Sequence, residues 1–179
     1  MAAVTPPHPL AEADGRSLFY CGRESLNNWF RRHAWSNQVS GASRVNVIAD
    51  ASSGQVVGYV TLSSAHIERA FLPKSQQRNS PDPVPVTLLG QLAIDKAYQG
   101  QGHAASLLTF ALGTALRAAS VIGSVGVTTH PLDDTAREFY ARWGFQDLPF
   151  DPRRAMLVRM IDLQKSFGGA NAPMRDENR

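Results

Sequence analysis

The sequence predicts an α/β protein in which a mixed β-sheet is flanked by helices. An apolar run at residues 88–94 is followed by a glycine-containing loop and then by a long helical segment. Upstream, residues 43–50 and 55–67 alternate or run apolar around a Ser-Ser-Gly turn, which is typical of an antiparallel hairpin. The chain has 179 residues, 43% of them hydrophobic, which is enough for one well-buried core and short for two. We therefore expect a single domain.

The first half of the chain predicts few regular elements besides this hairpin. The Pro-rich residues 2–10 indicate a loose or edge element. Residues 25–35 carry apolar side chains at helical spacing and predict an amphipathic helix. Residues 68–86 contain four prolines among polar residues, so we expect a long irregular segment there.

The second half alternates between strand and helix signals. After the strand that ends near Ile94 we expect, in this order, a helix over 102–119, a strand over 121–129, a helix around Tyr140 and a last strand near 155–161. Gly168, Gly169 and Pro173 in a polar context indicate a mobile end. The domain is thus expected to span residues 1–163, with a mobile tail over 164–179.

The loop before the 102–119 helix has the chemistry of a phosphate site. It reads Gln99-Gly100-Gln101-Gly102-His103-Ala104. Its glycines allow backbone to approach a ligand closely, and the following helix directs N–H groups and its positive dipole end at any anion there. A Walker loop would need Gly-Lys-Ser/Thr, and a dinucleotide fingerprint a third glycine and a later acid. Taken alone, the loop also fits a tight turn before a packed helix.

A second informative segment is Asp133-Asp134-Thr135-Ala136-Arg137-Glu138-Phe139-Tyr140-Ala141-Arg142-Trp143-Gly144-Phe145. Acids occupy its first turn, apolar residues recur at helical spacing, and Gly144 stands where a helix would end. This spacing turns Tyr140 inward. Taken alone, Tyr140 is either a catalytic group or a core tyrosine with a satisfied hydroxyl.

Together the two segments resemble the GNAT N-acetyltransferase superfamily. The loop matches the acetyl-CoA pattern Gln/Arg-x-x-Gly-x-Gly/Ala, and Ala-x-x-Phe-Tyr-x-x-x-Gly-Phe matches the penultimate helix. The resemblance implies the GNAT fold, an α/β (α+β) fold whose mostly antiparallel mixed sheet has a splay between its central strands, and acetyl-CoA as co-substrate. It implies that Tyr140 protonates the departing CoA thiolate. The implied cofactor-binding residues are Leu92, Ala93, Ile94, Gln99, Gly100, Gln101, Gly102, His103 and Ala104.

The amino-terminal half resembles one branch of this superfamily, the GNAT toxins of bacterial toxin–antitoxin modules. The matching strings are Phe-Tyr-Cys-Gly-x-x-x-Leu-x-x-Trp-Phe at 19–30, Ser-Arg-Val-x-Val at 43–47 and Pro-Val-x-Leu-Leu-Gly-Gln-Leu-Ala-Ile-Asp at 85–95. The resemblance implies acetylation of the α-amino group of aminoacyl-tRNA, which stops translation. It also implies a homodimer and a ribbon-helix-helix antitoxin, encoded alongside, that helps repress the operon. Gln91 departs from the pattern, in which Arg is usual.

The predicted chemistry is consistent with an aminoacyl ester as acceptor. No carboxylate lies between Leu88 and Ile94, where a water-linked base often sits in this superfamily. A lysine amine, with a pKa of about 10.4, would need such a base, whereas an α-amine near 8 is already substantially neutral. Glu68, His66 or a chain of waters remains an alternative base.

The charge of the chain permits a nucleic-acid partner but does not require one. The formal net charge is +3, and arginines recur along the chain, so a solvated basic face is the alternative. For tRNA contacts we single out Lys74 and Arg78 in the irregular segment. The five histidines lack metal-ligand spacing, so no metal is expected. One cysteine, and no apolar run of membrane-spanning length, favour a cytoplasmic protein without a membrane partner.

Two other functions stay open at this point. One is an ordinary GNAT enzyme that acetylates a small amine or a protein amino terminus. The other is an inactive acyl-CoA-binding module that acts through protein contacts, against which Tyr140 argues.

Overall fold

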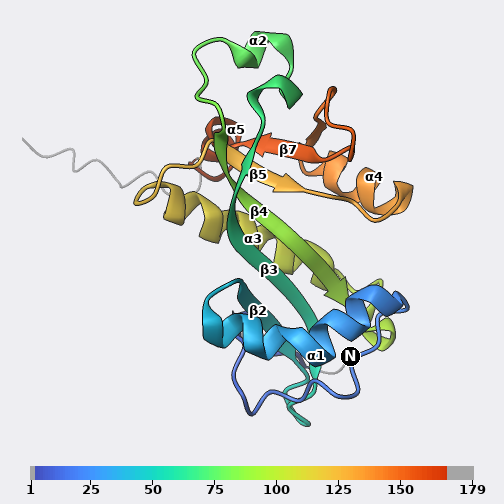
Figure 1. Ribbon diagram of the computed structural model, residues 1–179. Helices are drawn as coiled ribbons and strands as arrows, with labels where there is room; N and C mark the ends of the chain where they lie inside the picture. Colours follow the sequence, from blue (N-terminus) through green and yellow to red (C-terminus); the bar gives the residue numbers. More distant parts are fainter. Residues whose placement is uncertain (1–2, 169–179) are drawn as a thin grey trace, which may run out of the picture.

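The computed structural model describes residues 3–168 and is built around one seven-stranded sheet (Figure 1). The strand order is β1-β2-β3-β4-β5-β7-β6, and every neighbouring pair is antiparallel except β4 with β5. The predicted mixed, mostly antiparallel sheet is therefore confirmed. The strands are β1 (His8–Pro9), β2 (Arg44–Ala49), β3 (Val56–Ile67), β4 (Val84–Ile94), β5 (Gly126–Thr129), β6 (Gln146–Asp147) and β7 (Met156–Arg159).

Four of the five α-helices in the described residues bury apolar side chains against the sheet, whereas α2 has no buried residue. The helices are α1 (Glu24–Ser40), α2 (Lys74–Gln77), α3 (His103–Ala119), α4 (Asp134–Arg142) and α5 (Met160–Gly168). Helix α3 buries Leu107, Leu108 and Leu112 in the core cluster that also contains residues of β3 and β4. Helix α1 buries Phe30 and Ala34 in a second cluster with β2 and Tyr59 of β3. Each helix burial follows the 3.6-residue spacing of its apolar side chains.

The two central strands separate along their length. The parallel pairing of β4 with β5 joins only Thr87, Leu88 and Leu89 to Val127, Thr128 and Thr129. Beyond Leu89, β4 continues to Ile94 with β3 as its paired neighbour. A register shift in the β3–β4 ladder falls at this point, and a bulge of this kind bends a strand. The splay implied by the resemblance is thus present, and it leaves one edge of residues 90–94 open.

Several predicted boundaries were wrong: the helix expected over 25–35 extends to Ser40, and the segment expected to be irregular over 68–86 contains α2 and the first residues of β4. The strand expected over 121–129 begins only at Gly126, because Val121 and Ile122 are exposed and continue the turn after α3. The strand expected near 155–161 ends at Arg159, and α5 follows at once. Residues 164–168 belong to that helix rather than to a tail, since Leu163 is buried against the core. The rest of the predicted tail lies outside the described residues.

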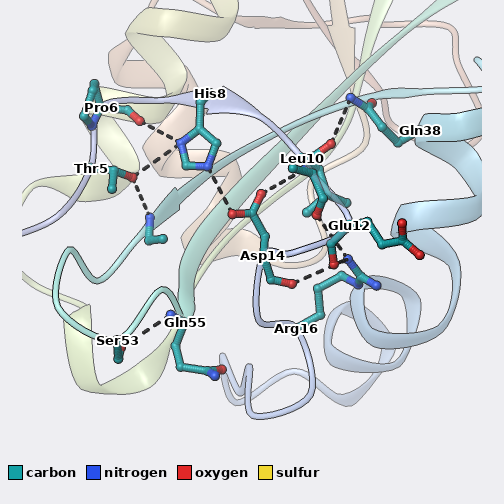
Figure 2. Close-up of polar contacts among 12 residues, drawn as sticks. Thr5, Pro6, His8, Leu10, Glu12, Asp14, Arg16, Gln38, Ser53 and Gln55 are labelled. Carbon is teal, nitrogen blue, oxygen red and sulfur yellow. Dashed lines mark hydrogen bonds and ion pairs between the residues drawn. The ribbon is translucent and has the colours of Figure 1, made fainter.

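The amino-terminal segment, expected to be either a loose or an edge element, forms the edge of the sheet. β1 pairs with β2, and the backbone of the segment is fixed by side chains (Figure 2). Asp14 Oδ2 accepts the Ala11 N–H at 2.8 Å, while His8 Nε2 lies 3.4 Å from Asp14 Oδ1. Thr5 Oγ1 accepts the Ala49 N–H at 2.9 Å. These contacts tie the segment to β2 before the chain enters α1.

In the part of the chain that the structure describes, the helices are too short or too polar to cross a lipid bilayer.

Candidate active site

A cleft opens where β4 and β5 diverge, and we call it the main cleft. Its volume is about 400 Å³. The floor is the end of β4, and the walls come from the segment before α1, the loop before α3, and α4. The lining residues are Cys21, Arg23, Leu26, Leu92, Ala93, Ile94, Gln99, Ala104, Leu132, Asp133, Thr135, Ala136, Phe139, Tyr140 and Arg142. The structure thus brings the predicted residues of β4, the glycine loop and Tyr140 to one place.

The start of α3 suits a bound phosphate. Its N-cap is Gly102, whose φ of +85° is the left-handed conformation that favours glycine. Among the described residues no side chain caps α3, and its first turn carries no acid. A Cβ built at Gly102 meets no protein atom within 4 Å. The first N–H groups of α3 are therefore open to an external anion, which is how helix N-termini bind phosphate.

The glycine loop is held in place by polar side chains around it. Gln99 Nε2 donates to the carbonyls of Cys21 and Ile94, both at 2.9 Å. Asp95 accepts N–H groups of Tyr20 and Ala97, both at 3.0 Å. Both carboxylate oxygens of Asp95 are thus engaged in holding the backbone, which leaves this acid with a structural role next to the site.

Two residues of the glycine loop, Gln101 and His103, do not line the main cleft. Gln101 is exposed and its Nε2 donates to the Ala97 carbonyl at 3.3 Å. The ring of His103 packs near Tyr98, with 6.3 Å between ring centroids, and its Nε2 is buried without a hydrogen-bond partner among the described residues. The His103 ring therefore packs at the root of the loop rather than standing free in solvent.

Tyr140 faces the main cleft from α4. Only 6% of its surface is exposed, and its ring packs against Phe139 and Phe145 at centroid distances of 5.3 Å. Burial disfavours the phenolate and raises the pKa of Tyr140 to about 12, while the Thr129 hydroxyl offsets part of this rise. At neutral pH Tyr140 therefore keeps its proton and can donate it.

A smaller pocket of about 60 Å³ continues from the main cleft past Tyr140, and we call it the side pocket. Five residues line both spaces: Leu26, Leu92, Leu132, Ala136 and Tyr140. The side pocket adds Gly90, Gln91, Thr129, His130 and Pro131. The described lining includes no Asp, Glu, Lys or Arg. A thioester in the main cleft and an acceptor amine in the side pocket would therefore meet beside Tyr140.

Sequence reasoning missed the arrangement of this pocket. Gln91 is held by Tyr59, whose hydroxyl lies 2.7 Å from Gln91 Oε1 and 2.9 Å from the Leu26 carbonyl. His130 follows β5 directly, and partial burial together with the charge of Arg153 lowers its pKa, with Asp151 opposing this. The position of His130 one residue after a buried strand was the available signal.

The other predicted residues lie away from the two pockets. His66 pairs with Pro85, five residues before Gly90, the nearest β4 residue of the side pocket, which is roughly 17 Å. Glu68 follows just beyond, so neither alternative base reaches the side pocket. Lys74 and Arg78 belong to α2 and its end, beyond the start of β4 and opposite the glycine loop (Figure 1). Within residues 3–168, no three His, Cys, Asp or Glu side chains are grouped to hold a metal ion.

Comparison with known proteins identifies the family of the chain. Residues 42–147 match the family model described as an acetyltransferase (GNAT) domain. The match covers more than half of the chain, including β4, the glycine loop and Tyr140. The chain therefore belongs to the GNAT acetyltransferase family.

Within this family the chain is similar to tRNA-acetylating toxins. A "tRNA-acetylating toxin" of Mycobacterium tuberculosis is 39% identical over 94% of this chain and 99% of that protein. The structure of AtaT complexed with acetyl-methionyl-tRNAfMet is 31% identical, with a TM-score of 0.84 over 92% of this chain and 99% of that one. Another similar structure is a tyrosine-to-phenylalanine mutant of the AtaT toxin, bound to the C-terminus of the antitoxin AtaR and acetyl-CoA. It is 26% identical, with a TM-score of 0.78 over 92% of this chain and 98% of that one.

Proposed function

We propose that this acetyltransferase is the toxin of a toxin–antitoxin module, and that it transfers acetyl from acetyl-CoA to the α-amino group of an aminoacyl-tRNA. The observation that carries the proposal is the 39% identity, over nearly the whole of both chains, to a protein named a tRNA-acetylating toxin. An N-acetylated aminoacyl-tRNA has lost its nucleophilic amine and cannot accept a growing peptide. The consequence would be inhibited translation.

The two pockets support this reaction. We propose that the pyrophosphate of acetyl-CoA binds at Gly100, Gly102 and the first N–H groups of α3, with the pantetheine arm along the open edge of Leu92, Ala93 and Ile94. Gln99, Gln101, His103 and Ala104 would complete this binding region. The open edge of β4 has unpaired backbone groups that an extended amide-containing arm can pair with.

The chemistry at the junction of the pockets would need one acid. The acceptor nitrogen would attack the thioester carbon, the C–S bond would break, and the nitrogen would pass its proton to solvent water, from which Tyr140 would regain the proton that it gives to sulfur. Tyr140 would donate its proton to the departing sulfur, since the phenol is protonated at neutral pH and lines both pockets. The lining of the side pocket carries no carboxylate to serve as base, which suits an α-amine with a pKa near 8 better than a lysine.

The proposed partners follow from the same reading. Lys74 and Arg78 would contact the tRNA backbone. An antitoxin of the ribbon-helix-helix type would bind the toxin and help repress the operon. The toxin would act as a homodimer in the cytoplasm, where its substrate is. The relative AtaT supports an antitoxin partner, since its structure holds the C-terminus of AtaR.

The test is acetylation of tRNA with labelled acetyl-CoA. The purified protein should label aminoacylated tRNA and leave deacylated tRNA unlabelled, and base hydrolysis should release an N-acetyl amino acid identified by mass spectrometry. Labelling of free amines or peptides in place of charged tRNA would instead assign the chain to the ordinary GNAT enzymes.

A further inference from the structure

The loop between β6 and β7 presents an aromatic ring to solvent. Half of the Phe150 surface is exposed, although Leu148 and Ala155 on either side are buried. Lys74 Nζ lies over the Phe150 ring, 5.3 Å from its centroid. Among the exposed apolar side chains of the described residues, Phe150 is an aromatic ring with a cation placed over its face.

This loop is held rigidly, so the exposure of Phe150 is built into the fold. The Asp151 carboxylate is buried and accepts the N–H groups of Arg153 at 2.9 Å and Ala155 at 3.2 Å. Leu148 N–H donates to the Ala155 carbonyl at 2.9 Å, which closes the base of the loop. The loop therefore stands as a fixed turn with the ring at its tip.

The same loop is joined to the catalytic helix. Arg137 of α4 donates through Nη2 to the Arg154 carbonyl at 2.6 Å and also forms an ion pair with Asp147. Arg137 precedes Tyr140 by less than one helical turn. At the other end of the loop, Met156 of β7 pairs with Thr129 of β5, which lines the side pocket. Phe150 is thus positioned relative to both Tyr140 and the side pocket.

The charges around the ring are mainly positive. Lys74, Arg153 and Arg154 are exposed, whereas the nearby acids are engaged: Asp151 by backbone N–H groups and Asp147 by Arg137. An aromatic platform with cations beside it has the composition of a single-stranded nucleic-acid site, in which a base stacks on the ring and phosphates contact the cations.

We propose that Phe150 stacks on a base of the unpaired 3′ end of the tRNA, with Lys74 and Arg153 contacting the adjoining phosphates, while the aminoacyl ester at that end enters the side pocket. This inference rests on the proposed function, because it assigns a contact to the same substrate. It also gives Lys74 a specific place on the RNA.

The experiment measures tRNA binding rather than acetylation. Affinities of wild-type protein and of Phe150→Ala are measured for deacylated tRNA with an intact 3′ end and for the same tRNA with its unpaired 3′ end removed. Phe150→Ala should weaken binding of intact tRNA about 5- to 150-fold, the range that one stacked base contributes. Trimming should weaken wild-type binding and have little further effect on Phe150→Ala. Phe150→Trp should bind intact tRNA about as tightly as the wild-type protein does, and intact tRNA should quench the fluorescence of the added tryptophan.

Leu18→Ala is the matched control, since it also removes an exposed apolar side chain, 72% exposed, elsewhere on the molecule. Equal binding of intact tRNA to wild-type protein and Phe150→Ala, or equal loss for intact and trimmed tRNA, would overturn the inference. Loss of dimerisation in Phe150→Ala with tRNA binding unchanged would also overturn it and assign the ring to a second copy of the chain. If wild-type protein acetylates aminoacyl-tRNA in any of these cases, the proposed function stands and only the stacking is lost.

Discussion

Helices α3 and α4 both begin at the main cleft, but their first turns differ in charge and in capping. Asp133 Oδ1 accepts the Ala136 N–H at 2.8 Å, and Asp134 adds a second negative charge to the first turn of α4. Helix α3 begins at Gly102 with neither a capping side chain nor an acid in its first turn. A side chain satisfies the N-terminus of the helix that carries Tyr140, whereas the first N–H groups of α3 have no such partner among the described residues. An absent cap is informative here only together with an absent acid, because α1 also lacks a capping side chain but carries Glu24 in its first turn.

The contribution of α4 is tested by Tyr140→Phe, for which we expect the largest effect. The substitution keeps the ring and its contacts with Phe139 and Phe145 but removes the proton donor. The single-turnover rate of acetyl transfer should fall by roughly 10²–10⁴, the usual contribution of a positioned acid, while acetyl-CoA binds nearly normally by calorimetry. A fall of less than about tenfold in a folded variant would make Tyr140 a packing residue.

The contribution of α3 is tested by Gly102→Val, with Gly54→Val as its control. Both glycines have positive φ and open space around a built Cβ, so both substitutions strain the backbone in the same way. Only Gly102 faces the proposed pyrophosphate. We expect Gly102→Val to weaken acetyl-CoA binding by at least about tenfold and Gly54→Val to leave it unchanged. Equal affinities in the two variants would remove the phosphate site from this loop.

The sequence predicted those parts of the site that depend on local pattern. Paired glycines before an apolar 3.6-residue repeat place the start of α3, and the same repeat turns Tyr140 inward. The apolar pattern of the sequence was misleading where apolar residues are exposed, as at Val121 and Ile122. Composition alone does not say whether another element covers a side chain. The short apolar run before Ile161 fits strand or helix equally well, which explains the missed start of α5.

The side pocket depends on contacts between distant parts of the chain, and these have no local signature. Tyr59 and Gln91 are 32 residues apart, and their hydrogen bond exists only because β3 pairs with β4. Arg23 and Asp133, which pair across the main cleft, are 110 residues apart. Recognition of the family supplied the splay of β4 and β5, because no single strand encodes the point at which two strands part.

The smallest expected effect concerns the cap of α4 itself, and three variants separate the cap from the charge. Arg23→Ala removes the ion pair with Asp133, which is partly exposed, so the free energy of unfolding should fall by less than about 1 kcal/mol. Asp133→Asn also loses the pair but keeps an oxygen that can cap, and should match Arg23→Ala. Asp133→Ala loses both the ion pair and the cap, so its free energy of unfolding, measured with urea, should be lower by a further ~1 kcal/mol.

Calorimetry on the same three proteins completes the comparison. Because the cap of α4 acts on helix stability and the open N-terminus of α3 acts on the ligand, Asp133→Ala should lose stability with little change in acetyl-CoA affinity, the reverse of Gly102→Val. If Asp133→Asn is as unstable as Asp133→Ala, the charge rather than the cap maintains α4. If Asp133→Ala instead weakens acetyl-CoA binding as much as Gly102→Val does, the two helix starts do not divide these roles.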